Sequence, residues 1–199
     1  AEGIPMTENY LMEFDGPRTP FESEWDSATE LARAIFFTNA KDFENGARTW
    51  PMGLRAEARQ NTFVMFHKGQ AVSGIGRLER DISVYGHQLR IGYIGSVCTH
   101  PDYRKLGLAS SVLSATMKRF HEDNVDFVCI SGNREMYRRA GSRFVGGLER
   151  FILPKDSLTS MGECEVKIAE RSDIKTLAML NDREPIFSKR PLSDYEIVL

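Results

Sequence analysis

The order of hydrophobic and polar positions along the chain predicts alternating helices and strands. Apolar side chains recur at three- and four-residue spacing between residues 21 and 37, which indicates an amphipathic helix. The same spacing predicts a second helix from Arg104 to about Phe120. A shorter helix is expected over residues 133–140, because Gly141 supplies a left-handed helix end.

Runs of β-branched and aromatic residues predict the strands. Residues 62–66, 71–84 and 89–99 are separated by short polar turns, as in an antiparallel meander. Residues 125–131 are nearly all apolar, which is typical of a strand buried on both faces. A short strand is also expected over residues 10–14, before the breaking sequence Asp-Gly-Pro, and a last one over residues 144–153. The predicted fold class is therefore α/β or α+β, with a mixed sheet.

A change in composition suggests how the 199 residues are organised. Residues 1–155 hold all these elements and are expected to form one domain, followed by a linker over 156–163. Residues 164–199 start with a strand-like run, and a helix is expected from Ser172 to about Asn181. This segment is too short to bury a core alone. It is interpreted either as the start of a second domain or as an extension that packs on the first domain or swaps to a partner.

The composition and charge of the chain exclude several classes of partner. The net charge is −2 and no basic stripe with interleaved aromatics occurs, so no nucleic-acid partner is predicted. No run of about 18 apolar residues occurs, so no membrane partner is predicted. The three cysteines, Cys98, Cys129 and Cys164, form no CxxC pair, and the N-terminus lacks the pattern of a signal peptide. The predicted location is the cytoplasm, and no metal site is predicted.

The segment that suggests chemistry lies where the third meander strand meets the second helix. After Pro101 turns the chain, the helix start offers several unpaired backbone N–H groups and a positive dipole end. Such a helix start suits a phosphate or pyrophosphate. Gly107 allows close approach to the backbone, while Arg104 and Lys105 can add charge-assisted hydrogen bonds. A plain strand–turn–helix link is the competing interpretation of these residues alone.

The sequence Arg104-Lys105-Leu106-Gly107-Leu108-Ala109 resembles the Arg/Gln-x-x-Gly-x-Gly/Ala signature of the GNAT superfamily of N-acetyltransferases. Downstream, Met136-Tyr137-Arg138-Arg139-Ala140-Gly141 is similar to that family's second motif, an aromatic-rich short helix that ends in Gly. The resemblance extends over about residues 8–153. It implies the GNAT fold, with a mixed, mostly antiparallel sheet, flanking helices and two strands that splay at an acetyl-CoA site. The segment 164–199 also resembles the start of another GNAT domain, as in bacterial tandem proteins.

The resemblance also implies roles for individual residues. The strand backbone at Val97, Cys98 and Thr99 would bind the pantetheine arm and polarise the thioester carbonyl. The cofactor's pyrophosphate would be held by the backbone of Arg104, Lys105, Leu106, Gly107, Leu108, Ala109 and Ser110. Tyr137 would act as the general acid that protonates the departing CoA thiolate, a role that a phenol can fill. Packing on one face of the short helix is the alternative role for Tyr137.

The general base is not assigned by this comparison. Many family members carry a Glu on the strand before the signature, but residues 89–99 contain no carboxylate. Glu79, Tyr93, His100 and a chain of water molecules are the candidates. Cys98 offers a covalent acetyl-cysteine route only if a partner base lies beside it.

The predicted function is acetyl-CoA-dependent transfer of an acetyl group to a primary amine by direct attack. The acceptor, a small molecule or a peptide, is not identified by the sequence, and a homodimer is an open alternative to a monomer. A catalytically weak CoA-binding module with a regulatory or assembly role is the alternative, and a transferase with another acyl donor is a third hypothesis.

Overall fold

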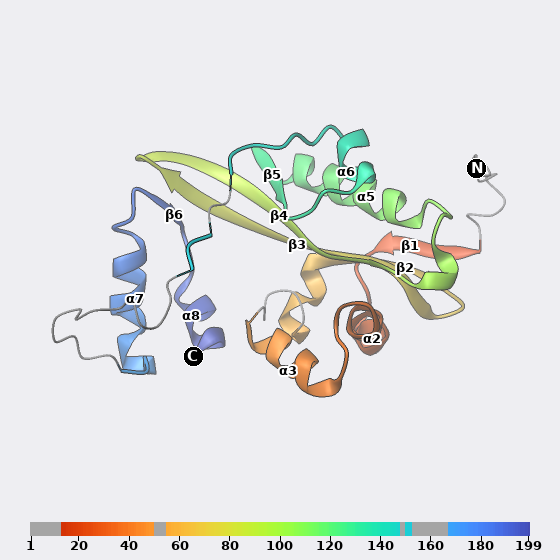
Figure 1. The fold of residues 1–199 in the computed structure, drawn as a ribbon, viewed down its shortest axis with the longest axis horizontal. Coiled ribbons are helices and arrows are strands. Elements are labelled where there is room, and N and C mark those ends of the chain that lie inside the picture. The colour runs from red at the N-terminus through yellow and green to blue at the C-terminus, as the bar shows by residue number, and fades with distance from the viewer. Residues whose placement is uncertain (1–12, 50–54, 148–149, 153–166) are drawn as a thin grey trace.

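The computed structural model describes residues 13–49, 55–147, 150–152 and 167–199 and shows a mixed sheet between two layers of helices (Figure 1). The sheet has the order β1-β2-β3-β4-β5, and only the β4–β5 pair is parallel. These strands are β1 (Phe14–Arg18), β2 (Thr62–His67), β3 (Gln70–Val84), β4 (His87–Thr99) and β5 (Phe127–Ile130). The predicted fold class, with a mixed and mostly antiparallel sheet flanked by helices, is thereby confirmed.

Two tight turns produce the antiparallel meander that the sequence predicts. Lys68 and Gly69 join β2 to β3, and Tyr85 and Gly86 join β3 to β4. All four residues have positive φ, between 48° and 86°. Two consecutive residues of this kind match the right-handed twist of the strands that they connect. The turns therefore fix which strands are neighbours in the centre of the sheet.

Helices cover both faces of the sheet (Figure 1). On one face lie α2 (Trp25–Phe36) and α3 (Ala40–Thr49); on the other lie α5 (Leu108–Glu122) and the short α6 (Glu135–Arg139). The core on the α5 side includes Val112 and Phe120, which are 0% and 1% exposed. A second cluster buries Leu31 of α2 against Phe66 of β2. None of the described helices is long and apolar enough to cross a bilayer.

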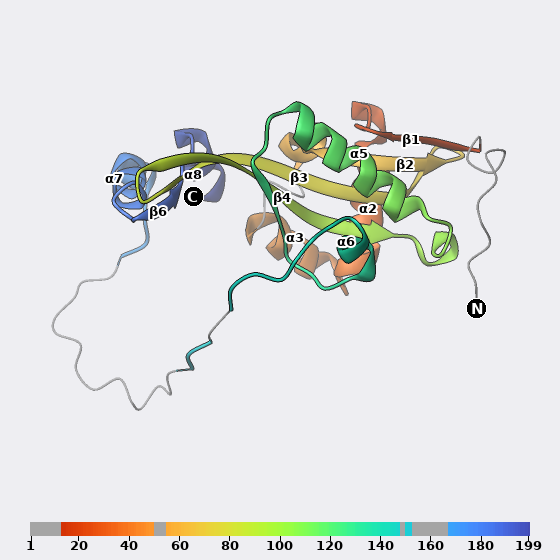
Figure 2. The ribbon, with the colours of Figure 1, turned by 90° about the horizontal axis from the view of Figure 1, so that it is seen from above.

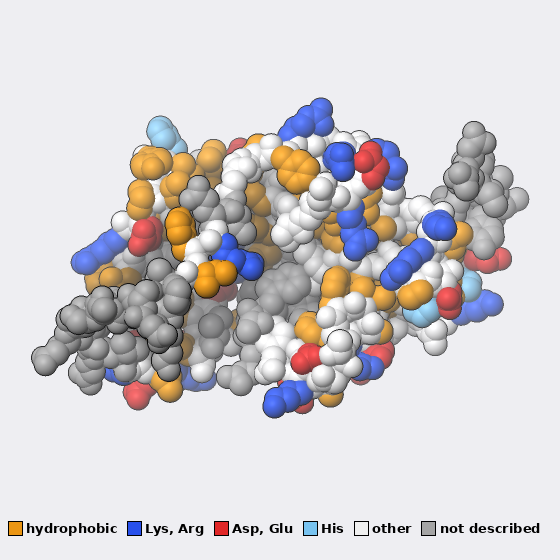
Figure 3. All heavy atoms as spheres, viewed as in Figure 1, with side chains coloured by type: hydrophobic (Ala, Val, Ile, Leu, Met, Phe, Trp, Pro, Cys, Tyr) orange, Lys and Arg blue, Asp and Glu red, His pale blue; other side chains and the backbone are white. Residues whose placement is uncertain are grey.

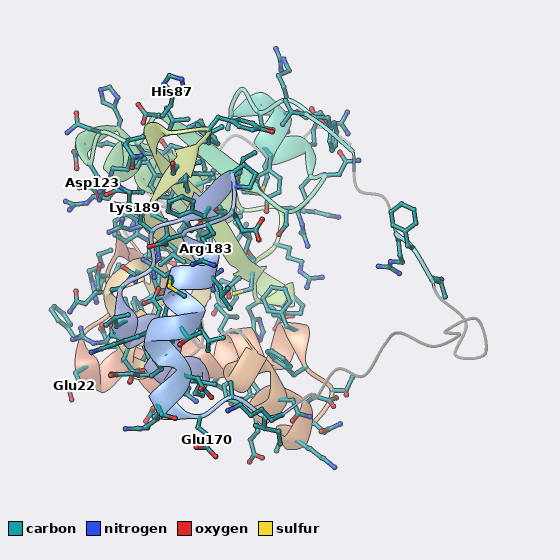
Figure 4. The ribbon with its side chains drawn as sticks, turned by 90° about the vertical axis from the view of Figure 1, so that its left-hand side faces the viewer. Glu22, His87, Asp123, Glu170, Arg183 and Lys189 are labelled. Atoms are coloured by element: carbon teal, nitrogen blue, oxygen red, sulfur yellow. The ribbon has the colours of Figure 1, made fainter. Side chains whose placement is uncertain are left out.

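The C-terminal residues join the same sheet. Beyond β2 and β5, the β3–β4 hairpin continues toward α7 (Ile174–Asn181), β6 (Ile186–Ser188) and α8 (Leu192–Val198) (Figure 2). Strand β6 pairs with β3 from Ile82↔Ser188 to Val84↔Ile186. Figure 4 looks onto this end of the molecule, with Lys189 beside β6 and Arg183 just beyond α7.

Polar contacts hold these residues in place. Lys189 N–H donates to the Asp81 carbonyl at 2.8 Å, and Arg80 forms a 2.6 Å ion pair with Asp194. Hydrophobic side chains gather on the visible face around the hairpin end (Figure 3), where Tyr85 and Ile186 are exposed. The helix predicted to end near Asn181 is confirmed. Residues 164–166 of the predicted strand lie outside the described residues, and residues 167–168, its described part, are not in a strand. The division into a domain, a linker and a second domain or extension stays a prediction.

Two predicted strands are wrong: the first lies at a different position, and the last does not form in the described residues. The first strand covers residues 14–18 rather than 10–14, of which 10–12 lie outside the described residues. It passes through Gly16 and Pro17 because an edge strand can accommodate Pro at a register shift. The last strand is absent from residues 144–147 and 150–152. Gly146, with φ of +70°, interrupts the extended backbone there.

Two other expectations also need correction. The second helix begins at Leu108, not Arg104, because Lys105 and Gly107 have φ of +67° and +77°, outside the helical region. Strand β5 is not buried on both faces, since Phe127 and Cys129 are exposed. Among the described residues, β4 is its only strand partner, so one edge of β5 remains open.

Gly92 on β4 provides a test of the packing between the sheet and α5. A Cβ atom added there would lie 2.8–3.0 Å from three ring atoms of Phe120. We expect Gly92→Ala to lower the free energy of unfolding by about 1–3 kcal/mol. Urea denaturation followed by circular dichroism measures this change. Gly147→Ala is the matched control, because no heavy atom lies within 4 Å of the added Cβ atom; equal stabilities of the two variants would contradict the described packing.

Candidate functional site

The site is built around the point where β4 and β5 separate. The two strands pair from Ile91↔Phe127 to Ile94↔Ile130. Strand β4 then continues to Thr99, while β5 has ended at Ile130. Among the described residues, no strand occupies the edge of β4 over residues 95–99 that faces away from β3. This stretch therefore offers backbone N–H and C=O groups to a ligand.

A β-bulge marks the same point. Between the pairs Gly74↔Cys98 and Gly76↔Gly95, β4 contains one residue more than β3. Ser96, at this position, has φ of +47°, a conformation that is uncommon for residues other than Gly. Its hydroxyl oxygen is buried without a hydrogen-bond partner in the described structure. Bulges are common beside active sites, because they redirect the side chains and the backbone around them.

The three predicted strand residues, Val97 to Thr99, lie directly after the bulge. The side chain of Val97 packs against the α5-side core, and that of Cys98 is buried on the α2 side. Ser73 Oγ lies 2.9 Å from Thr99 Oγ1 and donates to the Cys98 carbonyl at 3.2 Å. Since the side chains are engaged within the protein, any ligand at this edge would contact the backbone.

Burial determines the chemistry of Cys98. It raises the pKa of the Cys98 thiol to about 12, so the reactive thiolate is scarce near neutral pH. We expect iodoacetamide at about pH 8 to modify the exposed Cys129 but not Cys98 in the folded protein. Peptide mass spectrometry measures both sites, with the protein unfolded in guanidinium as the control. Rapid labelling of native Cys98, or its acetylation by acetyl-CoA, would revive the covalent route.

The segment from Arg104 to Ser110 forms a loop and then the first turn of α5. Positive φ at Lys105 and Gly107 turns the backbone before the helix begins at Leu108. No described group accepts a hydrogen bond from the backbone N–H groups of residues 105–110. The first turn of α5 contains no acidic residue. Free donors, the helix dipole and the absence of a competing carboxylate together suit an anion.

Arg104 and Lys105 differ in their surroundings. Arg104 Nε donates to the Thr99 carbonyl at 3.3 Å, so this side chain ties the loop to the end of β4. Lys105 is exposed and forms no ion pair with a described residue. The charge-assisted contact expected from the sequence is therefore open to Lys105, while Arg104 already has a partner.

The structure adds an anchor that the sequence analysis missed. Tyr103 lies just before the loop, and its hydroxyl is 2.9 Å from His67 Nδ1, at the end of β2. The rings of Phe14 and His100 lie 6.2 and 5.6 Å from that of Tyr103. Phe14 and His67 are far from Tyr103 in the sequence, so no local pattern could identify these contacts. It holds the loop against the β2 end of the sheet.

Tyr137 projects from α6 into the α5-side core. It is 4% exposed, and a Cβ atom at Gly132 would lie 3.2 Å from its ring. Its hydroxyl forms no hydrogen bond with a described residue. Burial raises the pKa of the phenol, and the nearby positive charge of Arg134 opposes that shift. A protonated phenol without an internal acceptor can donate to a ligand.

Two cavities meet at Tyr137. One, of about 320 Å³, lies between α5, β5 and α6. The other, of about 930 Å³, is lined by Tyr93 and Ile94 of β4, by β5, by α6 and by residues 143–145. The second cavity thus connects Tyr137 with Ile94 and Ile130, the last paired residues of β4 and β5.

The base candidates occupy different places. Glu79 forms ion pairs with Arg77 and with Arg90, the latter at 2.9 Å, and only 13% of its side chain is exposed. His100 accepts a hydrogen bond from Asp102 N–H at 3.4 Å in the turn before the loop. Tyr93 is the candidate whose side chain lines the larger cavity. No cluster of three or more metal-ligating side chains occurs among the described residues.

Comparisons with known proteins agree with this geometry. A family model for the GNAT acetyltransferase domain matches residues 17–145. A GCN5-related N-acetyltransferase from Kribbella flavida superimposes with a TM-score of 0.54 at 15% identity, over 66% of this chain and 33% of that one. No curated protein sequence is significantly similar to this one.

Shorter structures superimpose over almost their full length. A Trypanosoma brucei acetyltransferase gives a TM-score of 0.50 at 19% identity, over 68% of this chain and 97% of that one. Glucosamine-6-phosphate N-acetyltransferase from Arabidopsis thaliana gives a TM-score of 0.51 at 16% identity, over 69% of this chain and 97% of that one. The chain thus spans a third of the Kribbella protein and most of the other two, and at these identities the likeness is one of fold.

Proposed function

Because the chain belongs to the GNAT acetyltransferase family, we propose that it transfers an acetyl group from acetyl-CoA to a primary amine. The observation that carries this proposal is a row of backbone N–H groups at residues 105–110 that donate to no described group, directly after the edge of β4 that pairs with no described strand. This arrangement offers one place for a pyrophosphate and an adjoining place for an extended pantetheine arm.

The residues present fit such a cosubstrate. The amides of residues 105–110 would hold the pyrophosphate, with Lys105 adding charge. The backbone of residues 97–99 would hydrogen-bond the pantetheine arm and orient the thioester carbonyl. Acetyl-CoA itself supplies the activated acetyl group, so the protein's main task is to position two reactants.

Proton transfers complete the proposed reaction. The neutral amine forms a bond to the carbonyl carbon, and the bond between that carbon and sulfur breaks. Tyr137 donates its phenolic proton to the departing thiolate and recovers a proton from solvent. The proton lost by the amine passes to water, since Glu79 is held by two arginines.

Two measurements test this function. Acetyl-CoA should raise the melting temperature, because a ligand that binds only the folded state stabilises it. A free-thiol assay across a panel of primary amines should then detect CoA release that depends on both the amine and the protein. If acetyl-CoA binds but no amine supports thiol release, the N-acetyltransferase proposal fails.

One observation favours a second candidate function. Strand β4 carries no carboxylate, so the site lacks a strong base on the strand next to the reaction centre. A chain that binds CoA without turnover would act in regulation or assembly. Tight CoA binding together with no thiol release from any amine is the result that this alternative predicts.

A further inference from the structure

The larger cavity has a distinctive wall. Its volume of about 930 Å³ is at the upper end of the range for small-molecule sites. It runs along β5 and α6, and none of its lining residues comes from the segment 97–110 that would hold the cosubstrate. It nevertheless includes Tyr93 and Tyr137, so a molecule bound there would extend to the proposed acid.

Positive charge lines this cavity. Its described lining residues include Arg134 and Arg138, at the start and near the end of α6, and Arg143 after α6, and none of the described lining residues is Asp or Glu. Within the described structure, Arg134 and Arg143 form no ion pair. Arg138 has a long one to Glu135, with 3.6 Å between Nε and Oε2. The chain as a whole has a net charge of −2, so this concentration is local.

Apolar side chains form much of the rest of the wall, together with the polar residues Ser131, Asn133 and Ser142. Phe127 of β5 and Phe144 and Val145 after α6 line the cavity and are exposed to it or to solvent. Arginines beside apolar side chains suit a ligand that has an anionic group on a hydrocarbon body, because guanidinium binds carboxylate and phosphate in a two-point geometry.

We propose that this cavity binds the acyl acceptor and selects amines that carry a carboxylate or a phosphate. The inference rests on the proposed acetyl transfer and adds the acceptor class. The cosubstrate also carries phosphates, and these are the competing source of an anion. Its pyrophosphate, however, is assigned to the amides of residues 105–110, which donate to no described group and lie outside the cavity wall.

The test compares amines of equal length and different charge. 6-Aminohexanoate, 6-aminohexanamide and 1,6-diaminohexane are assayed with acetyl-CoA by thiol release. We expect kcat/KM to be about tenfold higher for the carboxylate than for the amide, as a charge-assisted hydrogen bond would give. The diamine should be the poorest substrate, because its second ammonium group would face the three arginines.

Variants of the cavity arginines then test whether these side chains cause the preference for the carboxylate. In the double variant Arg134→Gln/Arg143→Gln the preference for the carboxylate should fall to about one, while the KM for acetyl-CoA should change by less than about twofold. Arg143→Lys should retain part of the preference. Arg183→Gln is the matched control, because Arg183 is exposed beyond α7 and is not part of the cavity wall (Figure 4).

The possible failures are distinct. Equal turnover of the three amines, or an unchanged preference in the double variant, overturns the assignment of acceptor class and leaves the transferase intact. A rise in the KM for acetyl-CoA with no change in acceptor preference shows that the arginines serve the cosubstrate's phosphates, which also overturns the inference. Absence of thiol release with every amine, including uncharged ones, overturns the proposed function itself.

Discussion

Replacing Tyr137 by Phe is expected to lower kcat for acetyl transfer by about 100-fold or more. The variant retains the ring that packs against α5 and loses only the hydroxyl, which has no described partner in the protein. Protonation of the leaving thiolate would then depend on water. The KM for acetyl-CoA should stay within about twofold, because the hydroxyl is assigned to the transition state rather than to cosubstrate binding.

The rate dependence on pH sharpens this test. Burial raises the pKa of Tyr137, so its phenol remains protonated above the pH of about 10 at which an ordinary tyrosine ionises. Above pH 10, kcat of the wild type should therefore follow the same pH dependence as kcat of the Phe variant, with no additional decrease from ionisation of Tyr137. Tyr85→Phe is the control, since Tyr85 is 74% exposed at the tip of the β3–β4 hairpin. A Tyr137→Phe enzyme as fast as wild type would restrict Tyr137 to a packing role.

Replacing Gly107 by Val is expected to raise the dissociation constant for acetyl-CoA by about 100-fold or more, through loss of two or more hydrogen bonds to charged groups. Gly107 has φ of +77° at the N-cap of α5, a conformation that a β-branched residue rarely adopts. The backbone would relax toward negative φ and turn the N–H groups of the loop away from a common point. Isothermal titration with acetyl-CoA measures the effect.

Gly86→Val separates this effect from simple backbone strain. Gly86 has φ of +86° in the turn between β3 and β4, so Val there suffers a similar conformational cost. We expect both variants to lose stability, but only the Gly107 variant to lose affinity. Equal affinity for acetyl-CoA in the two variants would show that the loop at Gly107 does not hold the cosubstrate.

Local sequence signals predicted the centre of the sheet and its long helices. The turns at Lys68-Gly69 and Tyr85-Gly86 are short, and the strands around them are rich in β-branched and aromatic residues. Periodicity also indicated α2 and the body of α5. It could not place the start of α5. Lys105 has φ of +67° in the structure, and nothing about a lysine in the sequence indicates a positive φ.

Non-local pairing limited the remaining predictions. Residues 144–153 have strand-like composition, and β5 has an edge that pairs with no described strand, yet a strand also needs an uninterrupted extended backbone, which the positive φ of Gly146 breaks. The bulge at Ser96 depends on how β4 aligns with β3, and the contact between His67 and Tyr103 joins residues 36 positions apart. The sequence therefore predicted the central strands and the long helices better than it predicted how the site segments are held, and the roles assigned to the site residues stay predictions.

The amides of residues 105–110 at the start of α5 are proposed to hold the cosubstrate's pyrophosphate, because they donate to no described group. Backbone amide resonances of ¹⁵N-labelled protein, recorded during titration with CoA and separately with pantetheine, test it most directly. We predict that the amide signals of residues 105–110 shift with CoA, while pantetheine, which lacks the pyrophosphate, leaves them nearly unchanged. Saturable CoA binding that leaves these amides unperturbed would contradict the account.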